Sequence, residues 1–347
     1  MTTFDARAWL AWLAAGSLLA ILIGNPLYLL LLLLISRVVE AACAPPAARG
    51  RRLPLGRISL MILVFSTLFN VLMAHYGRTV LWSLPDGWPL IGGPLTLEAA
   101  VFGFINGLRL VTMLSFFMAF NTIVPVHELA GLTPRALHEL GLVLLIAITY
   151  IPETTLQYRR IRDAQAIRGH EFNGLRAWRP IIIPLLIAGL ERALNLSETM
   201  VARGYGSTGG RAMTPRARLL MPVGLLLALA GALRLSWGGP DGWLLVAFGA
   251  LAVAVAWRDL GRLVIHTRYR PRRPTWADGL VALGAIVALL PLIWPMLPGT
   301  GRSLVAYSPY PQLTMPPFNL WVGLGLFGLV VPAVLALARG PVAEVAR

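Results

Sequence analysis

Ten apolar segments constrain this chain to a helical membrane fold. A helix needs about 20 apolar residues to cross the hydrocarbon core of a bilayer, and most of these segments approach that length. Charged residues make up only 13% of the 347 residues, whereas soluble domains carry about 25%. The sequence therefore predicts an all-α polytopic membrane protein. The segments are 8–23, 27–43, 58–76, 97–120, 137–151, 181–197, 219–237, 243–257, 277–297 and 318–338.

The positions of the arginines indicate which of these segments cross. All 30 basic residues are arginine, and the formal net charge is +15. A soluble protein with this charge would suggest nucleic-acid binding. In a membrane protein, basic residues instead accumulate in cytoplasmic loops. We therefore expect no nucleic-acid partner and use the arginines to orient the chain in the bilayer.

The segments 137–151 and 181–197 conflict with this rule if they cross. The six arginines between them would then lie outside the cell, against the positive-inside bias. We therefore predict that neither crosses and that about eight other helices do, with both termini in the cytoplasm. The predicted parts are a four-helix transmembrane region (1–120), a cytoplasmic insert (121–215) and a C-terminal region of about four helices (216–347).

The insert has two predicted helices of its own. Residues 136–169 are typical of a helix that is first apolar and then polar, and 178–202 are typical of an amphipathic helix. In the second helix Glu191 and Glu198 share one face. Charges at mid-bilayer are unfavourable, so a helix at the membrane surface fits this sequence better. A buried span in which Glu191 pairs with Arg192 stays open as the alternative.

Two arginine-glycine sequences recur 35 positions apart in the insert, as Ile167-Arg168-Gly169 and Ala202-Arg203-Gly204. Each follows a predicted helix, where the helix dipole favours a cation and a glycine can adopt the left-handed conformation that ends the helix. A guanidinium offers five donors in a planar fork, which suits an acidic or carbonyl-lined groove on a partner. The residues alone fit either ordinary helix caps or docking groups.

The pair resembles the two Ala-Arg-Gly signatures of the transmembrane T component of energy-coupling factor (ECF) transporters, the family that includes the T subunits of biotin and cobalt importers. The segments 159–166, 200–205 and 121–132 also resemble that family, so the resemblance covers about residues 1–215 and extends to 262–297. The chain departs from the family at Ile167, where alanine is usual. Four predicted spans also follow the insert where one is common.

The resemblance implies a coupling subunit of an importer for a vitamin or a transition metal in the plasma membrane. Its partners would be two ATP-binding-cassette (ABC) ATPases, a small substrate-binding membrane S component and the lipid bilayer. The apolar surfaces of 137–151 and 181–197 would form the platform for the S component. The implied ATPase-docking residues are Ala166, Arg168, Gly169, Ala202, Arg203 and Gly204. The implied supporting residues of the coupling helices are Arg159, Arg160, Arg162, Gln165, Glu191 and Glu198.

Catalytic chemistry has no recognisable pattern in this sequence. It contains neither a phosphate-binding loop nor metal-ligand spacing among its five histidines, so we expect no cofactor, no metal and no catalytic residue, with ATP hydrolysis on partner subunits. The alternative function is a self-contained secondary transporter. It would use a polar path near Asn106 and Arg109, which lie three residues apart in the fourth segment. We favour the interpretation that these two residues lock helices together.

Overall fold

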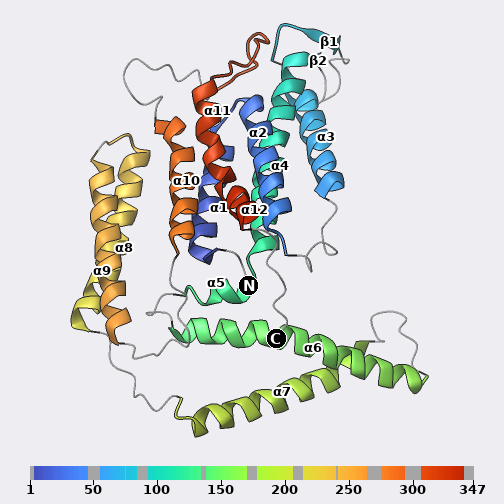
Figure 1. Ribbon diagram of the computed structural model, residues 1–347, viewed down its shortest axis with the longest axis vertical. Helices are drawn as coiled ribbons and strands as arrows, with labels where there is room; N and C mark the ends of the chain where they lie inside the picture. Colours follow the sequence, from blue (N-terminus) through green and yellow to red (C-terminus); the bar gives the residue numbers. More distant parts are fainter. Residues whose placement is uncertain are drawn as a thin grey trace. The chain divides into compact units, whose positions relative to one another are not determined.

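Helices dominate the structure of this protein, which is a computed structural model (Figure 1). It describes residues 4–45, 55–74, 76–83, 93–133, 138–169, 178–205, 214–239, 241–263, 275–293 and 306–339. The contacts divide the chain into two compact units, of which one combines Met1–Glu128 with Pro271–Arg347 and the other is Leu129–Arg270. The prediction of an all-α polytopic membrane protein is confirmed.

The first unit is a bundle in which the beginning and the end of the chain pack together (Figure 1). Helices α1 (Ala6–Leu22) and α2 (Pro26–Cys43) form the hairpin at the N-terminal end, and the Asn25 side chain caps α2 by accepting from the Leu27 N–H. The C-terminal helix contacts this hairpin and consists of α11 (Leu320–Leu326), the 3₁₀ turn η6 (Phe327–Val330) and α12 (Val331–Ala338).

The core of this bundle is a row of aromatic side chains. Trp9, Trp12 and Phe116 are fully buried, and their rings meet at 5.6 and 4.8 Å between centroids. The Trp12 indole N–H also donates to the Leu329 carbonyl at 2.9 Å, which satisfies this buried donor. This bond joins η6 to α1, which lie near opposite ends of the sequence.

Small residues bring the other helices of the bundle together. Helix α3 (Leu55–Met73) packs on α4 (Leu97–Ile123), and α10 (Trp276–Ile293) packs on α1 and η6. A β-carbon on Gly103 of α4 would lie 2.8 Å from the Thr67 backbone of α3. Such close approach of helix backbones is common in membranes, where packing rather than apolar burial drives helix association.

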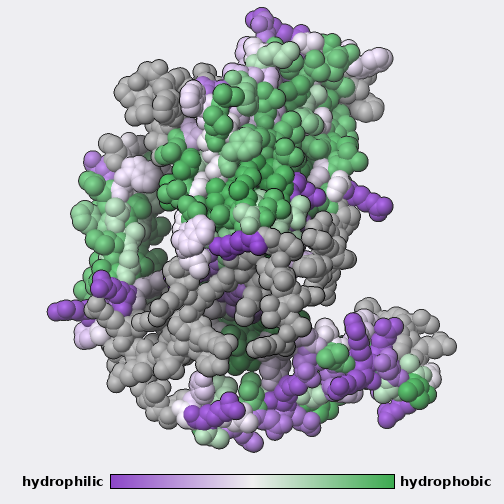
Figure 2. Space-filling model, in the orientation of Figure 1, coloured by the Kyte–Doolittle hydropathy of each residue, from purple (hydrophilic) through white to green (hydrophobic). Residues whose placement is uncertain are grey.

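Apolar side chains cover much of the visible face of this bundle (Figure 2). On α3 Met61 and Phe65 are about 70% exposed, as expected for side chains that face lipid. By length and composition eight helices could cross a membrane among the described residues. They are Pro26–Cys43, Leu55–Met73, Leu97–Ile123, Glu139–Ile167, Arg179–Ala202, Pro215–Ser236, Gly242–Asp259 and Leu320–Ala338.

This set differs from the eight predicted spans. It admits Glu139–Ile167 and Arg179–Ala202, which we predict not to cross, and it omits the shorter apolar helices Ala6–Leu22 and Trp276–Leu292. This criterion does not weigh the six arginines between the two apolar segments, of which Arg159, Arg160 and Arg162 lie within α6, and those arginines are the basis of the topology prediction. The division into 1–120, 121–215 and 216–347 stays a prediction.

In the described part of the second unit, four long helices pair in sequence order. The first pair is α6 (His138–Ile167) with α7 (Arg179–Ala202), and the second is α8 (Pro215–Ser236) with α9 (Gly242–Leu263). In the second pair, small residues recur every seven positions along each facing side. They are Ala217, Gly224 and Gly231 on α8 and Gly242, Gly249 and Ala256 on α9, and all six are buried.

A short hairpin of two strands precedes α4 and was not predicted from the sequence. Strand β1 (Val80–Ser83) pairs antiparallel with β2 (Pro94–Thr96). The fully buried Glu98 carboxylate at the start of α4 accepts from the Thr79 N–H at 3.0 Å and from the Thr79 hydroxyl at 2.9 Å. These bonds hold the segment before β1 against α4.

Candidate functional site

Helix α6 ends at the first arginine-glycine sequence. After Ile167 the chain turns through Arg168 to Gly169, which has φ +76°. The Gly169 N–H donates to the Ala166 carbonyl at 3.0 Å, so it satisfies one of the carbonyls left open at the helix end. A left-handed φ disfavours residues with a β-carbon, and this explains the glycine.

Helix α7 also ends at an arginine followed by a left-handed glycine, and here the structure shows both backbone hydrogen bonds of the turn. Gly204 has φ +81°, and its N–H donates to the Val201 carbonyl at 2.9 Å. The Tyr205 N–H reaches back to the Met200 carbonyl at 2.9 Å. These two bonds define a Schellman ending, with Arg203 as the last residue before the turn.

Both arginines are exposed at these ends. Among the described residues, neither the Arg168 nor the Arg203 guanidinium makes a hydrogen bond or an ion pair. The backbone N–H groups of the glycines cap the two helices, so the two arginine side chains are not needed to end them. The predicted helix ends are confirmed, and the docking role of the arginines stays a prediction.

The two ends lie far apart because α6 and α7 are antiparallel neighbours (Figure 1). The Gln165 amide donates to the Pro180 carbonyl at 3.5 Å, which sets the end of α6 beside the beginning of α7. Arg203 follows 23 residues after Pro180, so at 1.5 Å per residue it lies about 35 Å from the Arg168 end. The pair therefore presents two separate cations, one at each extremity, rather than one double site.

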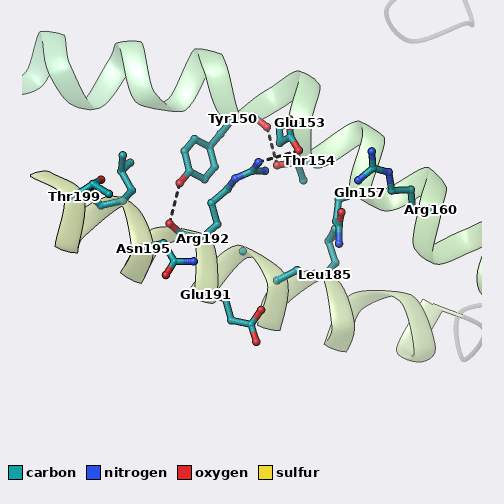
Figure 3. Close-up of a pocket in the computed structure, with 13 residues that line it drawn as sticks. Tyr150, Glu153, Thr154, Gln157, Arg160, Leu185, Glu191, Arg192, Asn195 and Thr199 are labelled. Atoms are coloured by element: carbon teal, nitrogen blue, oxygen red, sulfur yellow. Dashed lines mark hydrogen bonds and ion pairs between the residues drawn. The ribbon is translucent and has the colours of Figure 1, made fainter.

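An ion pair joins the middle of the two helices (Figure 3). The Arg192 guanidinium of α7 pairs with the Glu153 carboxylate of α6 at 2.9 Å and lies 5.6 Å from the centre of the Tyr150 ring. The Tyr150 hydroxyl donates to the Arg192 carbonyl at 3.5 Å. An exposed ion pair contributes about 0.2–1 kcal/mol, and an exposed cation–π contact about 0.5–1 kcal/mol. We call this three-residue contact the clasp.

A groove of about 660 Å³ runs along the clasp between the helices (Figure 3). Two of the predicted supporting residues, Arg160 of α6 and Glu191 of α7, line this groove. Glu191 does not pair with its neighbour Arg192, as the alternative span model required, because Arg192 reaches across to Glu153. That pairing is therefore wrong.

The other predicted site residues lie in local clusters. Ala166, Arg168 and Gly169 form the end of α6, and Ala202, Arg203 and Gly204 form the end of α7. The structure does not bring these two groups together. The supporting residues Arg159, Arg162 and Glu198 are exposed, and Gln165 is half-buried against α7.

Sequence reasoning missed two of the three clasp residues, Tyr150 and Glu153. Their signal is weak, because an isolated acidic residue after Pro152 does not reveal a partner 39 positions away. The one sequence signal for this contact is the charge of Arg192 within an apolar stretch, which indicates that the side chain needs a partner.

Apolar side chains are exposed on both helices of this pair. On α6 Leu140 and Val143 are each 61% exposed, and on α7 Leu186 and Leu190 are 67% and 64% exposed. From position 139 to 167 no residue of α6 is buried, and Ile181 is the one buried residue of α7. These surfaces could contact lipid or an apolar partner.

The polar pair on α4 has a structural role. Arg109 donates to the Ile23 carbonyl at the end of α1 at 3.4 Å and to the Asn106 side chain at 3.5 Å. The guanidinium therefore ties α4 to the bend of the α1–α2 hairpin, which supports helix locking over a polar path. In the part of the chain that the structure describes, no three His, Cys, Asp or Glu residues could together hold a metal ion.

Comparison with known families identifies the region that carries these helix ends. The sequence model of the family described as "Cobalt transport protein", CbiQ, matches residues 2–215, which is more than half of the chain. The chain belongs to the CbiQ family. This membership confirms the resemblance stated above over residues 2–215, whereas its extension to 262–297 lies outside the match and stays a prediction. The matched region contains α1 to α4, the short helix α5 (Val126–Ala130), α6 and α7. The match ends at the first residue of α8, and α9 to α12 lie outside it.

Relatives of this CbiQ-family chain carry the name "Energy-coupling factor transporter transmembrane protein EcfT". The protein from Streptococcus thermophilus is 31% identical over 178 residues, covering 46% of this chain and 64% of the relative. The Lactococcus lactis protein is 30% identical, covering 43% and 60%, and the Bacillus subtilis protein is 26% identical, covering 44% and 61%. The chain thus spans less than two thirds of the length of each of these relatives.

Proposed function

We propose that this chain is the transmembrane coupling subunit of an ECF-type importer and has no catalytic step of its own. The observation that carries the proposal is the pair of exposed arginines at opposite ends of the α6–α7 pair. Two similar helix ends about 35 Å apart suit two similar partner grooves, one for each ATPase of a pair. The EcfT names of the relatives support the same assignment.

The docking groups are Arg168 and Arg203. Each guanidinium would enter an acidic or carbonyl-lined groove on one ABC ATPase, where a planar five-donor fork can make several charge-assisted hydrogen bonds. Gly169 and Gly204 hold the left-handed turns that free the arginines from capping. Ala166 and Ala202 keep the helix ends narrow. Arg159, Arg160, Arg162, Gln165, Glu191 and Glu198 would shape the surfaces around these ends.

The exposed apolar faces of α6 and α7 would carry the S component. Side chains such as Val143 and Leu186 are exposed where a small membrane protein could cover them. ATP binding and hydrolysis on the partners would move the helix pair and thereby the S component. The S component would select the cargo, a vitamin or a transition metal, in the plasma membrane.

A pull-down from native membranes tests the proposal. The tagged wild-type chain, solubilised in mild detergent, should recover two ABC-type ATPase subunits and a small membrane protein. The double variant Arg168→Glu/Arg203→Glu should insert normally and recover no ATPase. Recovery of the wild-type chain alone would reject the coupling function and favour a self-contained transporter.

The insert 121–215 is proposed to lie on the cytoplasmic side, with both chain termini. A cysteine at Asn173, between α6 and α7, should react with a membrane-impermeant maleimide only when the cytoplasmic face is accessible, because six arginines flank the site. Cys43→Ala provides the background without another thiol. Labelling of intact cells at position 173 from outside would mean that α6 and α7 cross the bilayer.

A further inference from the structure

Helices α6 and α7 do not share an apolar core. No residue of α6 between 139 and 167 is buried, and Ile181 is the one buried residue of α7. A helix pair with a continuous apolar seam has one geometry, because its interlocked side chains resist sliding and opening. This pair instead depends on a few discrete contacts, so those contacts set the angle between the helices.

Among the residues that the structure describes, these contacts fall at two places along the pair. At the closed end, where α6 leads to α7, the Tyr158 and Trp178 rings stack at 6.4 Å and Gln165 bonds the Pro180 carbonyl. At the middle lies the clasp of Arg192 with Glu153 and Tyr150 (Figure 3). Within the described residues, positions 193–203 make no hydrogen bond or ion pair with α6.

Arg203 therefore stands on an arm that extends beyond the clasp. Arg192 lies 12 residues after Pro180, and Arg203 lies 11 residues further, so the two distances are roughly 18 and 16 Å. A rotation about the closed end that moves Arg192 by about 3 Å would thus move Arg203 by about 6 Å. A displacement at Arg192 is therefore about twice as large at Arg203.

We propose that the clasp is a latch, in which Arg192 acts as a positioning residue that fixes where Arg203 lies relative to Arg168. Both partners of the ion pair are about 40–45% exposed, so water can replace the contact and the latch can open without unfolding either helix. Its role in coupling rests on the proposed function, but the latch itself is a property of the isolated chain.

Distances between spin labels on the purified full-length chain test the latch. In a Cys43→Ala background, labels at Val143→Cys and Val201→Cys report on the open end, since both positions are well exposed. Arg192→Glu places two carboxylates at the clasp. The mean distance between the labels should then increase by about 6 Å, and its distribution should become broader. Glu153→Arg should do the same, and the exchange Glu153→Arg/Arg192→Glu should restore the original distance.

Two controls separate the latch from a general effect of charge. Arg160→Glu makes the same charge change in the same groove but breaks no clasp contact, so the distance should not change. Labels at Ala164→Cys and Ile182→Cys, across the closed end, should give one distance in every variant. An unchanged Val143–Val201 distance in Arg192→Glu, or failure of the exchange to restore it, would overturn the latch.

Pull-downs distinguish failure of the latch from failure of the proposed function. If the wild-type chain recovers no ATPase, the proposed function fails, and the label distances still decide whether the latch exists. If the proposed function holds, Arg192→Glu should weaken ATPase recovery less than Arg203→Glu does, because the docking side chain remains and only its position is less restricted. Equal loss in both variants would contradict a positioning role.

Discussion

Arg203→Glu is expected to abolish recovery of ABC-type ATPases with this chain while leaving its insertion in the membrane intact. The side chain is exposed and has no task in the Schellman ending, which Gly204 and Tyr205 complete with backbone bonds. Its replacement should therefore leave the fold unchanged. Loss of one partner of a buried charge pair weakens binding by about 2–5 kcal/mol, which is about 30-fold or more, and a reversed charge adds repulsion. Arg168→Glu should weaken recovery in the same direction.

Two further substitutions make this experiment specific. Arg203→Lys keeps the charge but loses the planar fork, so recovery should fall between wild type and Arg203→Glu. Arg258→Glu, at an exposed arginine of α9, changes the net charge equally and should leave recovery at the wild-type level. Wild-type recovery by Arg203→Glu would show that this arginine is only a helix-end residue.

Gly249→Leu is expected to force α8 and α9 apart. A β-carbon at Gly249 would lie 2.5 Å from the Ala228 nitrogen and 2.6 Å from the Gly224 carbonyl oxygen, and both are backbone atoms that cannot move aside. Extra methylene groups in a well-packed interface lower the stability of the fold by about 1–3 kcal/mol. The added leucine side chain is larger, so its cost should exceed that range. Gly231→Leu should act alike, since its β-carbon would meet the Val246 nitrogen at 2.7 Å.

Spin labels at Leu226→Cys and Leu251→Cys, on exposed positions of the two helices, measure this separation. Helix axes move from about 8 to about 10 Å apart when larger residues fill an interface, so the distance should grow by about 2 Å or become broad. Ala250→Leu and Ala232→Leu add a similar bulk at the exposed neighbours of these glycines and should change nothing. An unaltered distance in Gly249→Leu would mean that this seam is not where the two helices meet.

Much of this fold could be predicted because its signals are local. The apolar segments follow from composition over about 20 residues, and the helix ends at Ile167 and Ala202 follow from an arginine before a glycine. Each of these features depends on backbone energetics within one or two turns, which a single sequence reveals. The pairing of β1 with β2 was missed, since its strands are only four and three residues long.

The sequence by itself therefore determined the membrane class, the positions of the helices and the presence of two arginines at helix ends. The tertiary structure alone decided which residues from distant parts of the sequence contact one another. Glu153 and Arg192 are 39 positions apart, and Trp12 and Leu329 are 317 positions apart. Contacts of this kind depend on how whole helices pack, and many residue pairs of similar chemistry compete for them. Hence local pattern gives the two arginines at helix ends, whereas packing gives the contact between Arg192 and Glu153 that joins the two helices.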